Sequence, residues 1–259
     1  MTLSLFGLLF SAVAVVSALA GDPEFTYRND SDALSPSEWP KAYPTCGGTK
    51  QSPIDVATPK LCSLHAAPPL AFFGSCPRYT MTVASDSYMA AGNGGNCSVT
   101  VKKISYSFAQ FHVHAPSEHT FNGKAFDGEI HFVHKNADGS AALVIGLFIE
   151  KTDEEVTEPA VDVLVDAMSD VTKNTTLGSY SELLSDYIGK SHLFNYAGSL
   201  TTPPCTEFVD WWLIRKPARI SSAQYDRIKA NLAELDVTVS GKNARPIQPL
   251  YERTVTLYS

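Results

Sequence analysis

Five of the seven histidines in this chain lie within one short segment, between positions 112 and 134. The first two belong to the run Gln110-Phe111-His112-Val113-His114, in which polar and apolar residues alternate as in a β-strand. Successive side chains of a strand point to opposite faces, so His112 and His114 share a face with their Cα atoms about 6–7 Å apart. Two imidazoles at this spacing can bind one Zn²⁺ ion, and a third ligand would complete a site with one position open for water.

The third ligand has three candidates farther along the chain: His119, His131 and His134. On the expected strand that ends at His134, His131 shares a face with Glu129, whereas His134 points the other way. Glu129 is a suitable acceptor for the far ring nitrogen of His131, as Gln110 is for His112. A lone histidine on a strand is usually a structural residue, but three histidines with two such partners predict a metal site. Strand alternation favours His131 as the third ligand and leaves the other two candidates open.

The elements that must position these residues are mainly strands. Strand patterns occur at Tyr79–Val83, Ser98–Lys102, Ile104–Val113, Gly128–His134, Ala142–Ile149 and Phe208–Ile214. Helical patterns occur at Glu158–Val171, Ser181–Ile188 and Ser221–Leu235, the last of which opens with a capping box. Asn93-Gly94-Gly95 predicts a turn between two strands, and residues 21–48 predict an irregular arm.

Strands and helices do not alternate regularly, and no internal repeat or low-complexity linker interrupts the chain. We therefore expect a single mainly β domain, with peripheral helices and a large twisted central sheet that is mostly antiparallel or mixed.

The first twenty residues, MTLSLFGLLFSAVAVVSALA, are uncharged and end in Ala18-Leu19-Ala20. This pattern predicts a secretory signal peptide over residues 1–20, with a membrane anchor as the alternative, and a functional domain over residues 21–259. We expect a secreted or extracellular protein, periplasmic in a bacterium, without a membrane span after cleavage. The net charge is −7 with no basic block, so nucleic acid is not an expected partner.

Export would allow disulfides to form among the five cysteines, which permit at most two bridges. Three triplets fit the pattern for N-glycosylation in a eukaryote, at Asn29, Asn96 and Asn174.

Longer motifs of the chain resemble those of the α-class carbonic anhydrases. The metal block of that family is similar to Gln110-Phe111-His112-x-His114, Ser117-Glu118-His119 and Glu129-x-His131-x-Val133-His134. Its other signatures resemble Gln51-Ser52-Pro53-Ile54-Asp55, Gly198-Ser199-Leu200-Thr201-Thr202-Pro203-Pro204-Cys205-x-Glu207 and Asn243-x-Arg245-Pro246-x-Gln248-Pro249. These motifs run from about Gln51 to Leu250, so the resemblance covers most of the chain.

The resemblance implies one zinc ion held by His112, His114 and His131. It implies reversible hydration of carbon dioxide to bicarbonate and a proton by attack of zinc-bound hydroxide, with Glu118 and Thr201 orienting the hydroxide proton. Further residues are implied to bind the substrate: Thr202, Val133, Val144, Leu200, Val209 and Trp211. The alternatives are a non-catalytic binding module with this fold and a zinc hydrolase of esters, which we expect at most as a side activity.

The resemblance also implies a disulfide between Cys46 and Cys205, and it assigns His119 and His134 to structural roles. One further bridge among Cys62, Cys76 and Cys97 is allowed, without a preference. Tyr88 stands near the position where the fastest relatives carry a histidine that shuttles protons. Tyrosine titrates near pH 10, so we expect slower, buffer-dependent turnover or a different group such as His65.

Overall fold

The computed structural model describes residues 24–29, 32–57, 61–65, 69–154, 156, 158–171, 174–175, 184–185 and 187–258. The expected signal peptide at residues 1–20 lies outside these ranges, as does the boundary at residue 21, so both stay predictions. No helix in the described ranges is long and apolar enough to cross a membrane.

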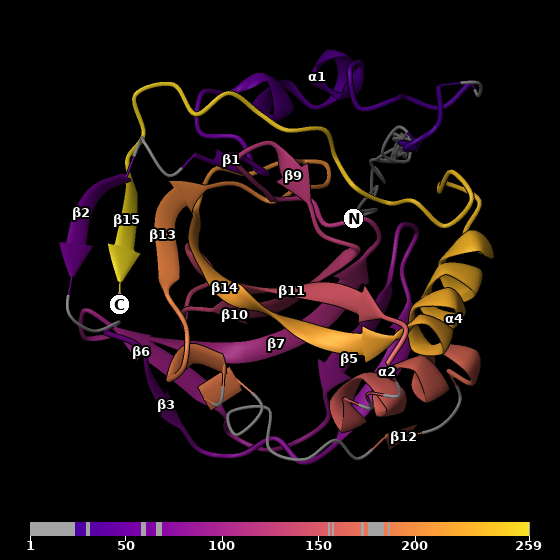
Figure 1. The fold of residues 1–259 in the computed structure, drawn as a ribbon. Helices are drawn as coiled ribbons and strands as arrows, with labels where there is room; N and C mark the ends of the chain where they lie inside the picture. The colour runs from indigo at the N-terminus through magenta and orange to yellow at the C-terminus, as the bar shows by residue number, and fades with distance from the viewer. Residues whose placement is uncertain are drawn as a thin grey trace, which may run out of the picture.

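One large curled sheet forms the body of the protein (Figure 1). Its strands follow the order β12 (Asn174–Thr175), β4 (Tyr79–Val83), β5 (Tyr88–Gly92), β7 (Ile104–His114), β10 (Gly128–Lys135), β11 (Ala142–Thr152), β14 (Val209–Ser221), β13 (Leu193–Gly198), β15 (Val255–Tyr258) and β2 (Leu61–His65). Two more strands, β3 (Ala71–Phe73) and β6 (Ser98–Val101), pair with each other, and β6 also pairs with the first half of β7. A separate small sheet consists of β1 (Asp55–Val56), β8 (Thr120–Phe121) and β9 (Lys124–Ala125).

Neighbouring strands of the large sheet are mostly antiparallel. In the described part of the chain, β11 pairs in parallel with β14 and β15 pairs in parallel with β2, while the other pairings in this sheet are antiparallel. The expected mainly β fold with a mixed, mostly antiparallel sheet is therefore confirmed. The turn expected at Asn93-Gly94-Gly95 lies between β5 and β6, where Gly94 and Gly95 adopt φ angles of 78° and 95° that glycine favours.

Helices lie at the edges of this body. Both α2 (Pro159–Ser169) and α4 (Ser222–Ala233) were expected, and they lie side by side at one corner of Figure 1, joined by a bond from Gln224 to Asp162. Ser221 and Gln224 form the expected capping box of α4. Of the helix expected at Ser181–Ile188, residues 184–185 and 187–188 are described and helical. In its described residues, 24–29 and 32–48, the N-terminal arm contains α1 (Trp39–Ala42), the 3₁₀ helix η1 (Pro44–Gly47), turns and an isolated bridge.

The two faces of the sheet carry different apolar clusters. The larger cluster contains Phe111 and Val113 of β7 and is covered by apolar residues of α2 and α4. The second cluster contains Val133 of β10, Val144 of β11 and Trp211 of β14. Because side chains alternate along each strand, the histidines of β7 point away from the larger cluster and toward the face of the second.

Two disulfides connect segments that are distant in the sequence. Cys46 of η1 is bonded to Cys205, the pair implied by the resemblance. Cys76 is bonded to Cys97, which decides between the pairings that the sequence left open. Cys62 lies on β2, where side chains are outside the described part of the structure. Two disulfides indicate an oxidising compartment.

Candidate metal centre

Three histidine rings converge on the face of the sheet that carries the second cluster. The register of β7 and β10 places His131 directly opposite His112, and Glu129 opposite His114. The ring centroids lie 5.0 Å apart for His112 and His114, 5.2 Å for His112 and His131, and 4.6 Å for His114 and His131. One ligand nitrogen from each ring lies within 4.8 Å of the other two. The predicted triad is therefore brought together at one point.

In each ring, one nitrogen faces the other two rings, and the remaining nitrogen lies next to a polar group that orients the ring. His112 Nδ1 lies 2.8 Å from the side-chain oxygen of Gln110, as strand alternation predicted. His114 Nδ1 lies 2.8 Å from the backbone oxygen of Asn243, a partner that the sequence analysis missed. His131 Nε2 lies 3.0 Å from Glu129 Oε1, off the direction of a linear hydrogen bond. Protons held on these atoms leave His112 Nε2, His114 Nε2 and His131 Nδ1 with free lone pairs.

The free nitrogens fit a metal ion. His114 is fully buried, and its Nε2 atom has no hydrogen-bond partner among the described residues. A buried polar atom without a partner calls for an explanation, and an imidazole nitrogen that faces two others is suited to bind Zn²⁺. Burial lowers the pKa of His112 well below its usual value, and the charges of His114 and His131 add to this effect. Burial also lowers the pKa of His131, against the opposing charge of Glu129. Low pKa values keep both rings neutral, the form that binds metal.

Glu129 organises the layer behind the triad. Its Oε1 atom lies 2.8 Å from His119 Nδ1 and contacts His131, while its Oε2 accepts bonds from the backbone N–H groups of Glu118 and His119 at 3.0 and 2.9 Å. Burial alone would raise the pKa of Glu129, but the charges and hydrogen bonds of His119 and His131 hold that pKa well below its usual value. A Cβ on Gly146 would stand 2.7 Å from Glu129 Oε1, so only glycine leaves room there.

His119 belongs to this supporting layer. It forms a second possible ligand group with Glu129 and His131. However, its Nδ1 faces Glu129 and its Nε2 lies 2.6 Å from the Tyr196 hydroxyl, so both ring nitrogens are engaged. His134 is fully buried on the opposite face, with Nδ1 3.2 Å from the backbone oxygen of Leu143. Both contacts agree with the structural roles expected for these two histidines.

Glu118 lies beside the ligand nitrogens. Its Oε1 accepts the backbone N–H of Arg245 at 2.8 Å. Its Oε2 lies 3.5 Å from His114 Nε2 and 3.9 Å from His131 Nδ1, without a hydrogen-bond partner in the described chain. Thr201 is almost fully buried, but no hydrogen bond joins its hydroxyl to Glu118 within the described ranges. The Glu118–Thr201 pair therefore stays a prediction.

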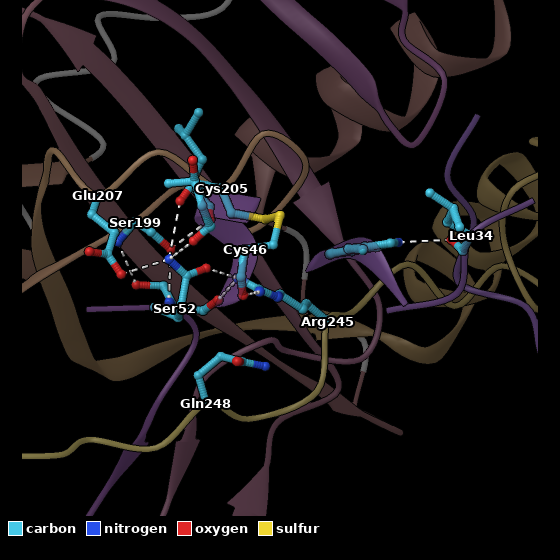
Figure 2. Close-up of a disulfide and its surroundings, with 12 residues drawn as sticks. Leu34, Cys46, Ser52, Ser199, Cys205, Glu207, Arg245 and Gln248 are labelled. Atoms are coloured by element: carbon cyan, nitrogen blue, oxygen red, sulfur yellow. Dashed lines mark hydrogen bonds between the residues drawn. A yellow bond between two sulfur atoms is a disulfide. The ribbon is translucent and has the colours of Figure 1, made fainter. Parts of the chain in front are cut away.

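The loop that carries Thr201 is fixed from several sides (Figure 2). The disulfide to Cys46 holds its end at Cys205, and Thr202 accepts the N–H of Cys205 through its backbone oxygen at 2.8 Å. At the start of the loop, Ser199 and Ser52 exchange two hydrogen bonds of 2.9 and 3.1 Å.

Arg245 lies beside Cys46 of the disulfide and connects the metal centre to the loop (Figure 2). Its guanidinium donates to the backbone oxygens of Cys46 and Ser52 and to the side-chain oxygen of Gln51. Gln51 in turn donates to the backbone oxygen of Cys205 and to Glu207. Since the backbone N–H of Arg245 also binds Glu118, one network connects the disulfide to the side chain next to the triad.

The five apolar residues implied to hold the substrate lie in one cluster: Val133, Val144, Leu200, Val209 and Trp211. Strand pairing explains why they meet, because Val133 is opposite Val144 and Val144 is opposite Trp211. The Trp211 ring also lies 4.8 Å from the His131 ring. An apolar wall therefore adjoins the triad.

The remaining predicted positions lie elsewhere. Tyr88 belongs to the larger cluster with Phe111, and its β5 neighbour Met89 is the residue opposite His112. Burial raises the pKa of Tyr88, and the charge of Glu234 adds to the effect. The structure does not bring Tyr88 to the face of the triad. His65 lies on the outermost strand β2, with its side chain outside the described part.

The glycosylation candidates Asn29 and Asn96 are exposed. The third, Asn174, lies on β12, where side chains are not described.

The chain matches the eukaryotic-type carbonic anhydrase family over residues 34–259. It is 31% identical to alpha carbonic anhydrase 2 of Arabidopsis thaliana over 229 residues, which cover 82% of this chain and 91% of that relative. It is 29% identical to dioscorin DB3L of Dioscorea polystachya over 267 residues, which cover 98% of this chain and 92% of that protein.

Among solved structures, the α-carbonic anhydrase of Thermovibrio ammonificans in complex with sulfanilamide superposes with a TM-score of 0.74 at 28% identity, covering 91% of this chain and 100% of that one. Because the family match spans most of the sequence and agrees with the fold and the triad, the protein belongs to the eukaryotic-type, or α, carbonic anhydrase family.

Proposed function

We propose that the protein catalyses the reversible hydration of carbon dioxide to bicarbonate and a proton, with zinc held by His112, His114 and His131. The observation that carries this proposal is the convergence of three oriented imidazoles on one point. Zinc bound there supplies a hydroxide nucleophile at neutral pH, a property for which carbonic anhydrase itself is the reference case. With His112, His114 and His131 as its protein ligands, a zinc ion would keep a position open for the reacting species.

The other residues take roles that follow from their surroundings. The apolar cluster beside His131 suits an uncharged substrate such as carbon dioxide. Glu118 Oε2 is free to accept a hydrogen bond, so Glu118 and Thr201 together orient the proton of the nucleophile. Contact with the bicarbonate product is assigned to Thr202 from its resemblance to the family residue at this position of the loop. Gln110 and Glu129 keep the protons of His112 and His131 away from the metal.

A non-catalytic binding function is the second candidate. Dioscorin, a relative whose name carries no enzyme activity, matches at nearly the same identity as a named carbonic anhydrase. Family membership therefore does not establish catalysis, and the intact triad is the reason that we favour an enzyme. A minor esterase activity would follow from the same nucleophile.

The test combines metal analysis with stopped-flow hydration of carbon dioxide on the wild type and on His112→Ala. We expect about one zinc per wild-type chain, rapid hydration, and loss of both in the variant. His192→Ala is the matched control, because His192 is exposed and lies outside the triad. Zinc retained in His112→Ala would refute the ligand assignment, and a zinc-loaded wild type without hydration would favour the binding function.

We also propose that the protein is secreted after cleavage near Ala20, because residues 1–20 fit a signal peptide and two disulfides are typical of an oxidising compartment. N-terminal sequencing of protein expressed from the full-length gene tests this proposal. A mature chain that begins near Gly21 in the medium or periplasm is the expected result, and a retained N-terminus would contradict it.

A further inference from the structure

Solvent reaches the triad at His112. His114 and His131 are almost fully buried, whereas His112 is half-buried. His112 lies on β7, which pairs with β10 on one side and with the middle of β5 on the other. Since β10 carries the buried His131, we expect a ligand that approaches the triad to pass the residues of β5 beside His112.

Two residues of β5, Met89 and Ala91, point to the face of the triad. Met89 pairs directly with His112 in the register of the sheet. Tyr88 and Ala90, which alternate with them, belong to the larger cluster on the opposite face. Because side chains alternate along a strand, Met89 and Ala91 share the face of His112. Directly paired residues have Cβ atoms about 4.5–5.5 Å apart, so the Met89 side chain begins next to that of His112.

These two residues, the β5 pair, continue an apolar surface on the face of the triad. Ala91 pairs with Gln110, and Gln110 pairs with Val133 of β10. Val133 starts the apolar wall that continues through Val144 and Trp211. One row of paired residues across the sheet is therefore apolar on both sides of Gln110.

The β5 pair suits an uncharged aromatic ring. Both side chains are half-buried, and their paired neighbours on β4, Thr82 and Thr80, are uncharged. Ala91 is short beside the long side chain of Met89, so the two form a step on the surface of the sheet. The unbranched thioether of methionine adapts to the shape of a ligand and makes favourable contacts with aromatic rings. A ring laid on this step would remove apolar surface of both residues from water.

We propose that the β5 pair is a binding subsite for an uncharged aromatic ring, carried by a ligand whose polar head binds at the triad. Aryl sulfonamides and aryl esters belong to this class of ligand. This inference rests on the proposed function, because the head needs the zinc ion that the triad would hold. The binding is non-covalent, and Met89 provides most of the contact because its side chain reaches farther from the sheet than the Ala91 methyl group.

Titration calorimetry with two probes measures the contribution of the subsite. Benzenesulfonamide and its para-phenyl derivative share one zinc-binding head, and the second probe carries one more ring. In the zinc-loaded wild type, we expect the added ring to tighten binding by about 2–10-fold. Met89→Ala and the similarly long but polar Met89→Gln should lose this gain, while Met89→Leu should keep most of it. Met81→Leu, a buried position of the larger cluster on the opposite face, is the matched control.

The methionine methyl groups give a second readout that does not depend on activity. Met81 and Met168 are buried in the larger cluster, whereas Met89 is half-buried on the face of the triad. In protein labelled with ¹³C at the methionine methyl groups, the para-phenyl probe should shift the NMR signal of Met89. That signal is assigned by its absence from Met89→Leu, and the signals of Met81 and Met168 should not move.

Several results would overturn the subsite and leave the proposed function intact. The added ring could give no gain in the wild type, or the gain could persist in Met89→Ala and Met89→Gln. A larger gain in Met89→Ala would show that the side chain obstructs the ring, and an unmoved Met89 signal would show that the ring lies elsewhere. Failure of both probes to bind a wild type that hydrates carbon dioxide would also overturn the subsite. Absence of hydration in the zinc-loaded wild type would instead overturn the proposed function, and this inference with it.

Discussion

The substitution Glu129→Gln tests how the protein sets the protonation of its metal ligands. Four N–H groups converge on the Glu129 carboxylate: the backbone N–H groups of Glu118 and His119, and the ring nitrogens of His119 and His131. Glutamine has nearly the same shape, but only one of its two terminal atoms accepts hydrogen bonds. Either orientation of the new amide therefore turns an NH₂ group toward donors.

The two orientations have different costs. With the NH₂ group toward the backbone, two buried N–H groups lose their acceptor, which costs about 1–3 kcal/mol each. With the NH₂ group toward the rings, His131 must accept at Nε2 and carry its proton on Nδ1, the atom that faces the metal site. Zinc binding then requires that proton to leave. Loss of such a partner typically weakens metal affinity 10–100-fold, or about 1.4–2.8 kcal/mol.

Chelator competition measures the zinc affinity, and urea unfolding of the metal-free protein measures its stability. If the NH₂ group of Glu129→Gln turns toward the rings, we expect zinc binding to weaken by about 10–100-fold. If it turns toward the backbone, we expect the free energy of unfolding to fall by about 2–6 kcal/mol. Glu150→Gln is the matched control, since Glu150 is exposed at the far end of β11. A variant with zinc affinity within twofold of the wild type and an unchanged free energy of unfolding would refute the argument that all these donors depend on the Glu129 carboxylate.

Three further predictions concern stability. Burial lowers the pKa of His134 to about 4, so between pH 4 and 6.5 the unfolded chain binds a proton that the folded chain does not. The free energy of unfolding should therefore rise with pH over this range, by up to about 3 kcal/mol. Urea unfolding curves of His134→Gln should show a flatter rise. Lys103 adopts φ 69° in the turn between β6 and β7, so Lys103→Gly should raise the free energy of unfolding by about 0.5–1 kcal/mol, and a loss would refute the strain. A Cβ on Gly198 would lie 2.3 Å from Ser52 Oγ, so Gly198→Ala should cost about 1–3 kcal/mol, and an unchanged melting temperature would show that the loop yields.

Strand alternation was sufficient to predict the face of the triad. Gln110, His112 and His114 alternate with apolar residues over one strand, so their shared face follows from local geometry. The same rule favoured His131 by its companion Glu129, and the register of β10 explains why it meets His112. The capping box at Ser221 likewise marked the start of α4 from local residues alone.

Contacts between distant segments could not be predicted in this way. The partner of His114 is a backbone oxygen of Asn243, 129 residues away, and every residue type offers such an oxygen. The strand β5 was missed because Tyr-Met-Ala-Ala-Gly lacks the β-branched residues that mark strands. Without β5, nothing in the sequence indicated that Tyr88 packs into the larger cluster while Met89 faces His112.

The Cys76–Cys97 disulfide depends on the path of the chain around β4 and β5, and spacing alone allowed three pairings. The contacts of Glu129 with His119 and with two backbone N–H groups could not be predicted either, because they form only when the loop after β7 folds over Glu129.

X-ray absorption at the zinc K-edge of the zinc-loaded protein shows directly whether His112, His114 and His131 bind the metal. Three imidazoles and one exchangeable oxygen should surround the metal at about 2.0–2.1 Å, with the scattering pattern of three histidine rings. The spectrum of His112→Ala should lose one ring, and that of Glu118→Gln should keep all three. Three results would refute the histidine triad as the complete set of protein ligands. These are fewer than three imidazoles, a sulfur neighbour at about 2.3 Å, or a shell that changes in Glu118→Gln because the carboxylate occupies the fourth position.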